Sequence, residues 1–327
     1  MYISKETELI VRLLQLPGFG SRSSEIVANC MVKNKAFDEA DIYTYIMNCI
    51  NNKLIRVKKE LSRLDIQYAV DKSNKIIGES LKNNVFIISK FDEDYPFMLR
   101  NLIGNRGEDT SPLILNYKGN LSSIKDRQSI AIIGTRHPTK EGEEAGMYYA
   151  KYFAEKGFNI VSGLALGCDT IAHKGALSVN GTTTAILAHG LQMISPKRNE
   201  FIAKEILEKG GLLLSEYLFG VPAYNTSFVE RDRLQAGLAI ATIVIQTGIK
   251  GGTMHAVRTT LEAHKPLFMV KFKSAEDNNH EKVQGNNQLI SEGKAFPLGS
   301  ETLTEAIERA RESIKNPSVT QVQGRFF

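Results

Sequence analysis

Residues 129–139 read SIAIIGTRHPT and residues 157–177 read GFNIVSGLALGCDTIAHKGAL, and these two stretches decide the fold. In each, a short apolar run rich in β-branched residues ends in a glycine-containing turn that leads into an amphipathic stretch. Short apolar strands that alternate with helices are typical of a parallel sheet covered on both faces. We therefore predict an α/β fold over residues 86–315, an extended Rossmann-like, mostly parallel sheet with helices on both faces. Comparable apolar runs begin at residues 183, 212, 241 and 267.

The first quarter of the chain has a different pattern, which predicts a small helical domain over residues 1–85. Apolar residues follow helical spacing on both sides of residues 16–20, LPGFG, and further helices are expected at 38–50 and 52–64. The LPGFG turn resembles the hairpin of a helix-hairpin-helix motif, whose backbone amides can hold a DNA phosphate. A plain corner between two helices, with Pro and Gly as stop signals, explains it equally well.

Other segments are predicted from their turn-forming residues and polarity. Residues 85–89 are a candidate strand, and residues 113–117 are expected to form a strand at the edge of the sheet. Residues 267–271 are expected to be the last strand. The predicted organisation ends with a polar loop at 273–287, a helix at 302–315 and a flexible tail at 316–327.

The composition indicates a soluble, cytoplasmic protein with a sizeable core and no membrane partner. Of the 327 residues, 42% are hydrophobic and 24% are charged, and the longest apolar runs are too short to span a bilayer. The N-terminus lacks the order of a secretory signal. The cysteines Cys30, Cys49 and Cys168 have no CxxC spacing and no disulfide pattern. Residues 1–90 hold 14 Lys and Arg against 10 Asp and Glu, so four of the five net positive charges fall there, which suits contact with phosphates without demanding it.

Three small-residue loops follow predicted strands and are expected to meet at one edge of the sheet. In open parallel sheets ligands bind beyond the carboxyl ends of the strands, where glycine lets backbone amides approach an anion. The alternative is that tight turns need glycine anyway. We favour a phosphate site. Its candidate residues are Gly134, Thr135, Arg136, Ser162, Gly163, Lys250, Gly251, Gly252 and Thr253.

Basic side chains near these loops are the candidates for direct phosphate contact. Arg136 follows its strand at once, where its guanidinium can fork onto a phosphate; the alternative is a surface arginine paired with a carboxylate. Arg231 and Arg233 lie near a helix start and either bind phosphates or neutralise the neighbouring Glu230 and Asp232. Lys197, together with the adjacent Arg198, would extend a basic rim along the same edge of the sheet.

No pattern of catalytic or cofactor-binding residues stands out. Asp169 and His173 are four residues apart and share a helix face, but no third partner is evident, so we interpret them as structural residues. The histidines and cysteines lack metal-ligand spacing. The GxxxxGK[ST] phosphate loop is missing from the sequence. We expect no catalysis, no cofactor and no metal.

Taken together, the motifs resemble the DprA/Smf family of DNA-processing proteins. The resemblance implies a Rossmann-like domain that binds single-stranded DNA in a basic pocket, often as a homodimer. It also implies protection of incoming single strands and loading of the RecA recombinase in natural transformation and homologous recombination. The matching blocks are DEDYPFMLRNL at 92–102, IAIIGTRHPT at 130–139, GFNIVSGLALGCDTIAHKGAL at 157–177, GGLLLSEY at 210–217, RDRLQAGLA at 231–239, TGIKGGTMHAVRTTLEAHKPLFMV at 247–270 and GNNQLISEGKAF at 285–296.

The resemblance assigns roles by position and also marks two departures. Arg136 corresponds to the arginine of a G-S/T-R turn that contacts DNA phosphate. Arg231 and Arg233 match an R-N-R segment near the same pocket, and residues 250–253 match a glycine-rich loop on its floor. Leu166 stands where the family commonly has arginine, and Asp232 stands where it has asparagine, so the pocket is expected to be less basic.

A second hypothesis is a nucleotide-sensing protein of a mobile-element or defence system, without catalysis. The sheet also resembles that of lysine-decarboxylase-like phosphoribohydrolases, whose PGGxGTxxE loop carries a glutamate. Ala256 occupies the corresponding position here, so the acid-base group of that hydrolysis is missing. DNA binding is the favoured hypothesis, with base stacking on aromatic residues near the pocket; core packing is the alternative for some of them. The candidates are Tyr217, Phe219, Tyr224 and Phe228.

Overall fold

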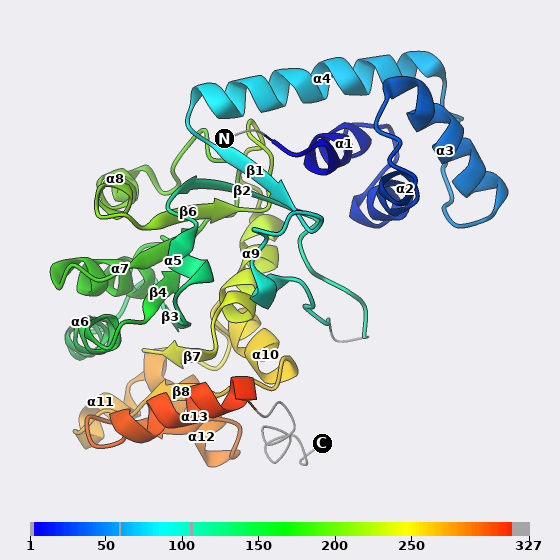
Figure 1. Cartoon of the computed structure of the whole chain (residues 1–327). Helices are drawn as coiled ribbons and strands as arrows, with labels where there is room; N and C mark the ends of the chain where they lie inside the picture. Colours follow the sequence, from blue (N-terminus) through cyan, green and yellow to red (C-terminus); the bar gives the residue numbers. More distant parts are fainter. Residues whose placement is uncertain (1–2, 59, 105–106, 316–327) are drawn as a thin grey trace.

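A nine-stranded sheet forms the centre of the protein in the computed structural model, which describes residues 3–58, 60–104 and 107–315 (Figure 1). The strand order is β1-β2-β6-β5-β4-β3-β7-β8-β9. Strand β2 runs antiparallel to both β1 and β6, and the other neighbours are parallel. The strands are β1 (Phe86–Ser89), β2 (Ile114–Gly119), β3 (Ser129–Ile133), β4 (Asn159–Ser162), β5 (Thr183–Ile186), β6 (Leu212–Ser215), β7 (Ala241–Val244), β8 (Leu267–Val270) and β9 (Phe296–Leu298).

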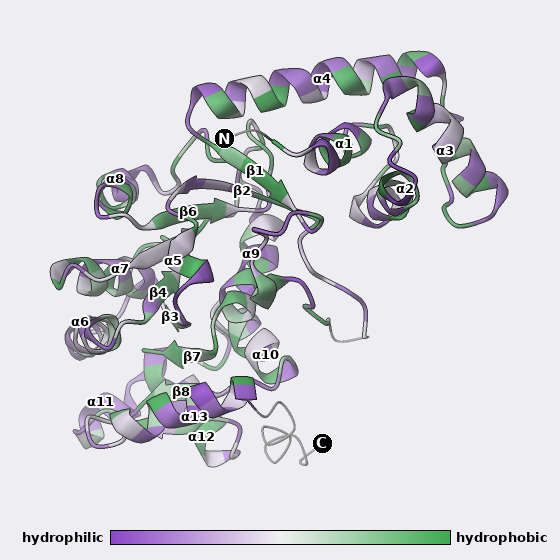
Figure 2. Cartoon of the chain, in the orientation of Figure 1, coloured by the Kyte–Doolittle hydropathy of each residue, from purple (hydrophilic) through white to green (hydrophobic). Residues whose placement is uncertain are grey.

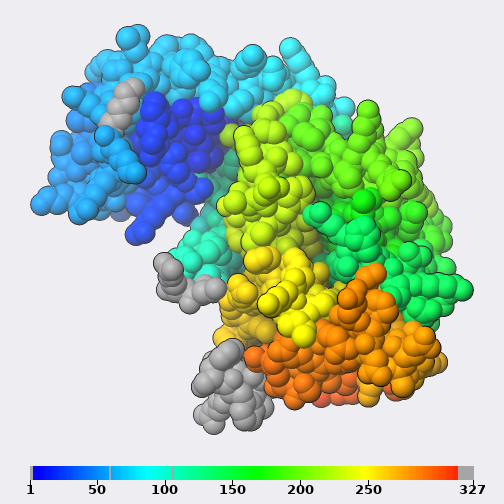
Figure 3. All heavy atoms as spheres, turned by 180° about the vertical axis from the view of Figure 1, so that it is seen from behind, coloured from blue at the N-terminus to red at the C-terminus, as the bar shows by residue number. Residues whose placement is uncertain are grey.

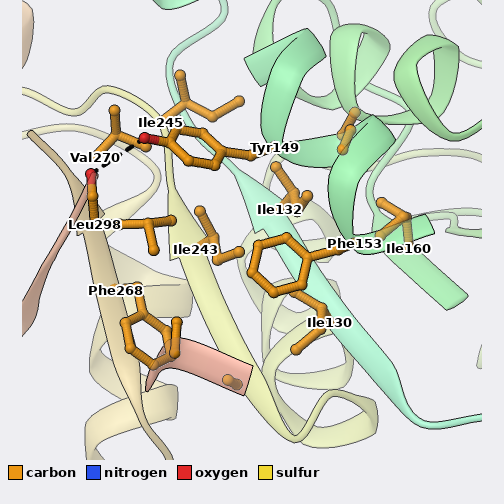
Figure 4. Close-up of a cluster of buried hydrophobic side chains, with 14 of the residues drawn as sticks. Ile130, Ile132, Tyr149, Phe153, Ile160, Ile243, Ile245, Phe268, Val270 and Leu298 are labelled. Atoms are coloured by element: carbon orange, nitrogen blue, oxygen red, sulfur yellow. Dashed lines mark hydrogen bonds between the residues drawn. The ribbon is translucent and has the colours of Figure 1, made fainter. Parts of the chain in front are cut away.

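Helices cover both faces of this sheet, as the continuous apolar strands predict. On one face Tyr149 and Phe153 pack on Ile132 and Ile243 (Figure 4). On the other face Leu234 and neighbouring residues pack on strands β4, β5 and β6. In Figure 2 strands β1, β6 and β7 are drawn mainly in the green of apolar residues. The helices are α5 (Ser122–Lys125), α6 (Lys140–Glu155), α7 (Cys168–Ser178), α8 (Glu200–Glu208), α9 (Asn225–Leu238), α10 (Met254–Glu262), α11 (Ala275–Asn279), α12 (Gln284–Ser291) and α13 (Leu303–Lys315), with short 3-10 turns at Phe97–Leu99, Lys197–Asn199 and Glu281–Val283.

The N-terminal helices α1 (Lys5–Leu13), α2 (Ser21–Lys33), α3 (Glu39–Asn51) and α4 (Arg63–Lys82) form a block at one end of the molecule (Figure 3). Their apolar faces form one cluster that also contains Ile87, Leu113 and Ile114 from the β1–β2 end of the sheet. The hydroxyl of Thr7 donates to the Ser89 hydroxyl at 2.7 Å, which ties α1 to β1. The predicted domain boundary between residues 85 and 86 stays a prediction, because the two parts share this core.

Two predictions about the N-terminal half are wrong. The helix expected at 52–64 does not form, because Lys53 lies in the left-handed region with φ 58°. Helix α4 begins later, after Ser62, whose hydroxyl accepts from the Asp65 amide while Asp65 accepts from the Ser62 amide, a capping box that fixes the start. The strand expected at the sheet edge is internal, since β2 has β1 on one side and β6 on the other.

Two predictions about the C-terminal part also need correction. The polar loop expected at 273–287 contains α11 and the start of α12, because Ser274 caps α11 by accepting from the Asp277 amide. Strand β8 does not close the sheet, since β9 pairs with it in parallel; β9 has three residues and includes Pro297, too short a pattern to read in the sequence. The tail predicted at 316–327 lies outside the described residues.

The switch in strand order lies between β3 and β7. From β3 the chain builds outward through β4, β5 and β6, and then returns to build outward on the other side through β7, β8 and β9. The loops after β3 and β7 therefore diverge to opposite faces and leave a crevice between them. Of the described helices, none combines the length and apolar character needed to cross a membrane.

Candidate functional site

A cavity of about 540 Å³ lies at this switch point, and we call it the switch-point cavity. Its walls come from the turn after β3, the β4–α7 loop, helix α9 and the β7–α10 loop, which confirms that these segments converge. Of the predicted phosphate-binding residues, seven line it: Gly134, Thr135, Arg136, Arg231, Gly251, Gly252 and Thr253. Further lining residues include Asp169, Phe228, Asp232, Gln235 and His255.

The turn that carries Arg136 is fixed by its neighbours on both sides. The Thr135 amide donates to the Gln246 carbonyl at 2.8 Å, and the Cys168 amide donates to the Thr135 carbonyl at 3.1 Å. Gly167 stands at the N-terminus of α7 with φ 75°, and a Cβ there would lie 2.5 Å from the Arg136 carbonyl carbon and oxygen. Glycine at 167 is therefore what allows the two loops to pack back to back.

Replacing Gly167 with alanine is expected to destabilise the fold by about 3 kcal/mol, because it combines a left-handed backbone with a steric overlap against main chain. The matched control is Gly157→Ala, which also has a positive φ, 84°, but whose added Cβ would meet nothing within 4 Å. The control is expected to cost about 1 kcal/mol. Urea unfolding of both variants measures the difference, and equal losses would show that the close packing at Gly167 is unimportant.

Arg136 is the basic side chain that is open to the cavity mouth. It is exposed, and its guanidinium carbon lies 5.8 Å from the centroid of the Phe228 ring on α9. Within the described part of the chain, no ion pair or hydrogen bond holds this guanidinium. Contact with the aromatic face instead directs it across the cavity, with its donors available.

Arg231 and Arg233 are engaged by the protein itself. Arg231 is buried, with Nη1 donating to the carbonyls of Gly163 at 2.6 Å and Ile186 at 2.7 Å, and Nε donating to Asp232 Oδ1 at 3.2 Å. Arg233 forms a two-pronged pair with Glu216, at 2.8 and 2.5 Å. Arg231 therefore neutralises Asp232, as the alternative predicts, whereas Arg233 pairs with Glu216 rather than with Glu230. The phosphate role of both arginines stays a prediction.

The remaining predicted residues lie away from the cavity wall. The Ser162 hydroxyl is buried and donates to the Ile132 carbonyl at 2.7 Å. Gly163 leaves room for the Arg231 guanidinium, because a Cβ at residue 163 would lie 1.8 Å from Arg231 Nη1. Lys197 is exposed in the short turn before α8, and Lys250 is exposed next to Gly251. Their contact with phosphate stays a prediction.

Asp169 and His173 are held in structural contacts. One Asp169 oxygen accepts from the amides of Gly163 and Ala165 at 3.2 and 3.3 Å, so it shapes the β4–α7 loop. His173 is fully buried beside the Thr183 hydroxyl at 2.7 Å. Burial lowers the pKa of His173 to about 3, so it stays neutral at physiological pH. No group of three or more potential metal ligands occurs among the described residues.

Asp232 gives the cavity an acidic wall. Its side chain is 18% exposed, and burial raises the pKa of its carboxyl to about 6, although the neighbouring Arg231 acts in the opposite direction. The sequence predicts a less basic pocket at this position, and the structure places the carboxyl on the cavity wall. Sequence reasoning gave no role to Gln246 or His255, which carry no motif of their own.

Comparison with known proteins finds relatives over most of the chain. The family model described as DNA recombination-mediator protein A matches residues 86–309. Protein Smf of Escherichia coli strain K12 is 32% identical over 197 residues, which cover 60% of this chain and 51% of that protein. The chain therefore spans about half the length of this curated relative.

Two solved structures share the architecture. The X-ray structure of DNA processing protein A from Streptococcus pneumoniae matches with a TM-score of 0.67 at 24% identity, over 93% of this chain and 99% of that one. DNA processing protein A from Helicobacter pylori, described as having a unique single-stranded DNA binding mode, matches with a TM-score of 0.57 at 27% identity, over 71% of this chain and 96% of that one. The first match confirms the predicted α/β fold with its N-terminal helical region.

Proposed function

The chain belongs to the DNA recombination-mediator protein A family, and from this premise we propose that it binds single-stranded DNA in the switch-point cavity without catalysing a reaction on it. The observation that carries the proposal is the guanidinium of Arg136, which lies over the Phe228 ring and is paired with none of the residues that the structure describes. An arginine beside an aromatic face offers a contact for a phosphate and a platform for the adjacent base.

The surroundings of the cavity support a single strand over a duplex. Val229 lines the cavity and is more than two-fifths exposed, and two further exposed apolar side chains, Tyr224 and Ile249, adjoin the lining residues Asn225 and Gly248 in sequence. Unpaired bases expose their faces to such side chains, whereas the bases of a duplex are stacked inside it. The backbone amides of Gly251 and Gly252 at the start of α10 add donors for phosphate oxygens.

The proposal that the protein is not a catalyst rests on the residues that line the switch-point cavity. Ala256 lines the cavity at the position of the glutamate in phosphoribohydrolase-like loops, and the Asp169 carboxylate is occupied by loop amides. We further propose that the protein acts in the cytoplasm as a homodimer in DNA uptake and homologous recombination, with RecA as the partner loaded onto the bound strand.

A nucleotide-sensing role is the second candidate, favoured by the cavity volume of about 540 Å³, which suits a small ligand. One titration separates the two candidates. Fluorescent single-stranded and double-stranded oligonucleotides are titrated at about 50 and 200 mM salt, with unlabelled nucleoside monophosphates as competitors.

We expect a preference for the single strand and a loss of roughly 20-fold in affinity across that salt range, as contact with about three phosphates implies. Saturable binding of monophosphates without binding of either oligonucleotide would support nucleotide sensing instead. Tighter binding of the duplex than of the single strand would contradict the proposal.

A further inference from the structure

Helix α9 places an aromatic face and a carboxylate side by side on the cavity wall. Phe228 and Asp232 are four residues apart on this helix, so they project on the same face one turn from each other. Both line the switch-point cavity. A base stacked on Phe228 can therefore reach the neighbouring turn, where Asp232 lies, with its hydrogen-bonding edge.

One oxygen of this carboxylate is committed to Arg231, and Asp232 itself lines the switch-point cavity. Arg231 Nε donates to Oδ1 at 3.2 Å. Arg231 Nη1 is held by the carbonyls of Gly163 and Ile186, so it does not cover Oδ2. Among the described contacts none ends on Oδ2, which leaves it as an acceptor for a ligand.

A carboxylate accepts hydrogen bonds and donates none, and the four bases differ in what they offer to it. Cytosine, adenine and guanine carry an exocyclic amino group that donates. Thymine has no exocyclic amino group: its single donor, N3–H, lies between two carbonyl oxygens that repel a carboxylate, so a carboxylate binds it less well. An asparagine side chain would not discriminate in this way, because its amide both donates and accepts.

We propose that Asp232 makes the switch-point cavity select bases with an exocyclic amino group over thymine. This selectivity rests on the proposed binding of single-stranded DNA and adds a preference among bases to it. Asp232 acts as a specificity-determining residue, while Phe228 and Arg136 supply contacts that are independent of sequence.

The selectivity depends on the ionisation of Asp232. The charged groups that face it are Arg231 on its own helix, Asp169 on α7 and Arg136 on the turn after β3, and His255 of α10 lines the same cavity. The pKa of Asp232 lies at about 6, so the carboxyl is ionised at about pH 7.5 and protonated at about pH 5. The protonated form carries an O–H donor that can bond a thymine carbonyl, so the preference is expected to shrink as the pH falls.

Two homopolymers of equal length, oligo(dC) and oligo(dT), provide the test, since both are pyrimidines with similar stacking surfaces. At about pH 7.5 the wild-type protein is expected to bind oligo(dC) at least about fivefold more tightly than oligo(dT), the low end of discrimination by a single base contact. In Asp232→Asn the ratio is expected to fall to about one, with tighter binding of oligo(dT).

The matched control is Glu308→Gln, which makes the same carboxylate-to-amide change at an exposed position of α13 and should keep the wild-type ratio. Thermal melting shows whether Asp232→Asn stays folded, and the wild-type ratio at about pH 7.5 gives a readout that needs no variant. Equal binding of the two homopolymers by the wild type, or an unchanged ratio in Asp232→Asn, overturns the selectivity while leaving DNA binding intact. Binding of neither homopolymer overturns both proposals.

Discussion

Replacing Arg136 with alanine is expected to weaken binding of single-stranded DNA about 30-fold and to leave the stability of the fold unchanged. The side chain is exposed and its guanidinium makes no described hydrogen bond to the protein, so its removal orphans no buried group. A charge-assisted hydrogen bond to phosphate contributes about 2 kcal/mol, which corresponds to that loss. Fluorescence anisotropy at several salt concentrations measures the affinity and its salt dependence, whose slope should decrease by about one phosphate contact.

Arg127 provides the matched control for this experiment. It is an exposed arginine that precedes β3, so it lies at the opposite end of the strand that leads to Arg136. Arg127→Ala removes the same charge from the protein and is expected to change the affinity less than about twofold. If the two variants lose affinity equally, the effect comes from net charge, and the switch-point cavity is not the binding site.

Arg231→Met is expected to destabilise the protein by about 3–5 kcal/mol, the range found when one partner of a buried charged pair is removed. The substitution leaves the carbonyls of Gly163 and Ile186 without their donor and Asp232 without its neighbouring cation. Urea unfolding measures the loss. Arg136→Met makes the same chemical change at an exposed position and is expected to cost less than about 0.5 kcal/mol.

The stability lost in Arg231→Met should also depend on pH. Burial already raises the pKa of Asp232 above its ordinary value, and Arg231 opposes that shift, so removing the arginine raises the pKa further. A carboxyl whose pKa is higher in the folded than in the unfolded state destabilises the fold where it is ionised, and that penalty is relieved as the pH falls. The difference from wild type should therefore be smaller at about pH 5 than at about pH 7.5. A folded, fully stable variant that fails to bind DNA would instead favour the phosphate-binding role predicted for Arg231 from its position.

The sheet could be predicted closely because its signal is local. Strands buried on both faces need uninterrupted apolar runs, and β3 falls on the expected residues, Ser129–Ile133. The predictions failed where the signal is short or comes from contacts distant in sequence. Strand β9 has three residues and pairs only with β8. Strand β2 is internal because β1 pairs with it in antiparallel orientation, and no pattern in the sequence predicts that pairing.

The convergence of the loops at the cavity could be predicted, because loops at the carboxyl ends of parallel strands meet at one edge of the sheet. The orientation of each side chain could not be predicted in this way. Arg136 and Arg231 are equally basic in the sequence. They differ in their partners. The Arg231 guanidinium donates to the carbonyls of Gly163 and Ile186, which are 68 and 45 residues away in sequence. The Arg136 guanidinium instead lies over the Phe228 ring, 92 residues away. Such partners are set by packing and are visible only in three dimensions.

The apolar cluster shared by helices α1–α4 and strands β1 and β2 has a consequence for truncated forms of the protein. A fragment that begins at β1 would leave Ile87, Leu113 and Ile114 facing water, and contiguous exposed apolar surface promotes association between copies. Helices α1–α4 alone would lose the same partners. Because the two parts share this cluster, we expect the helical block and the sheet to melt in one cooperative transition.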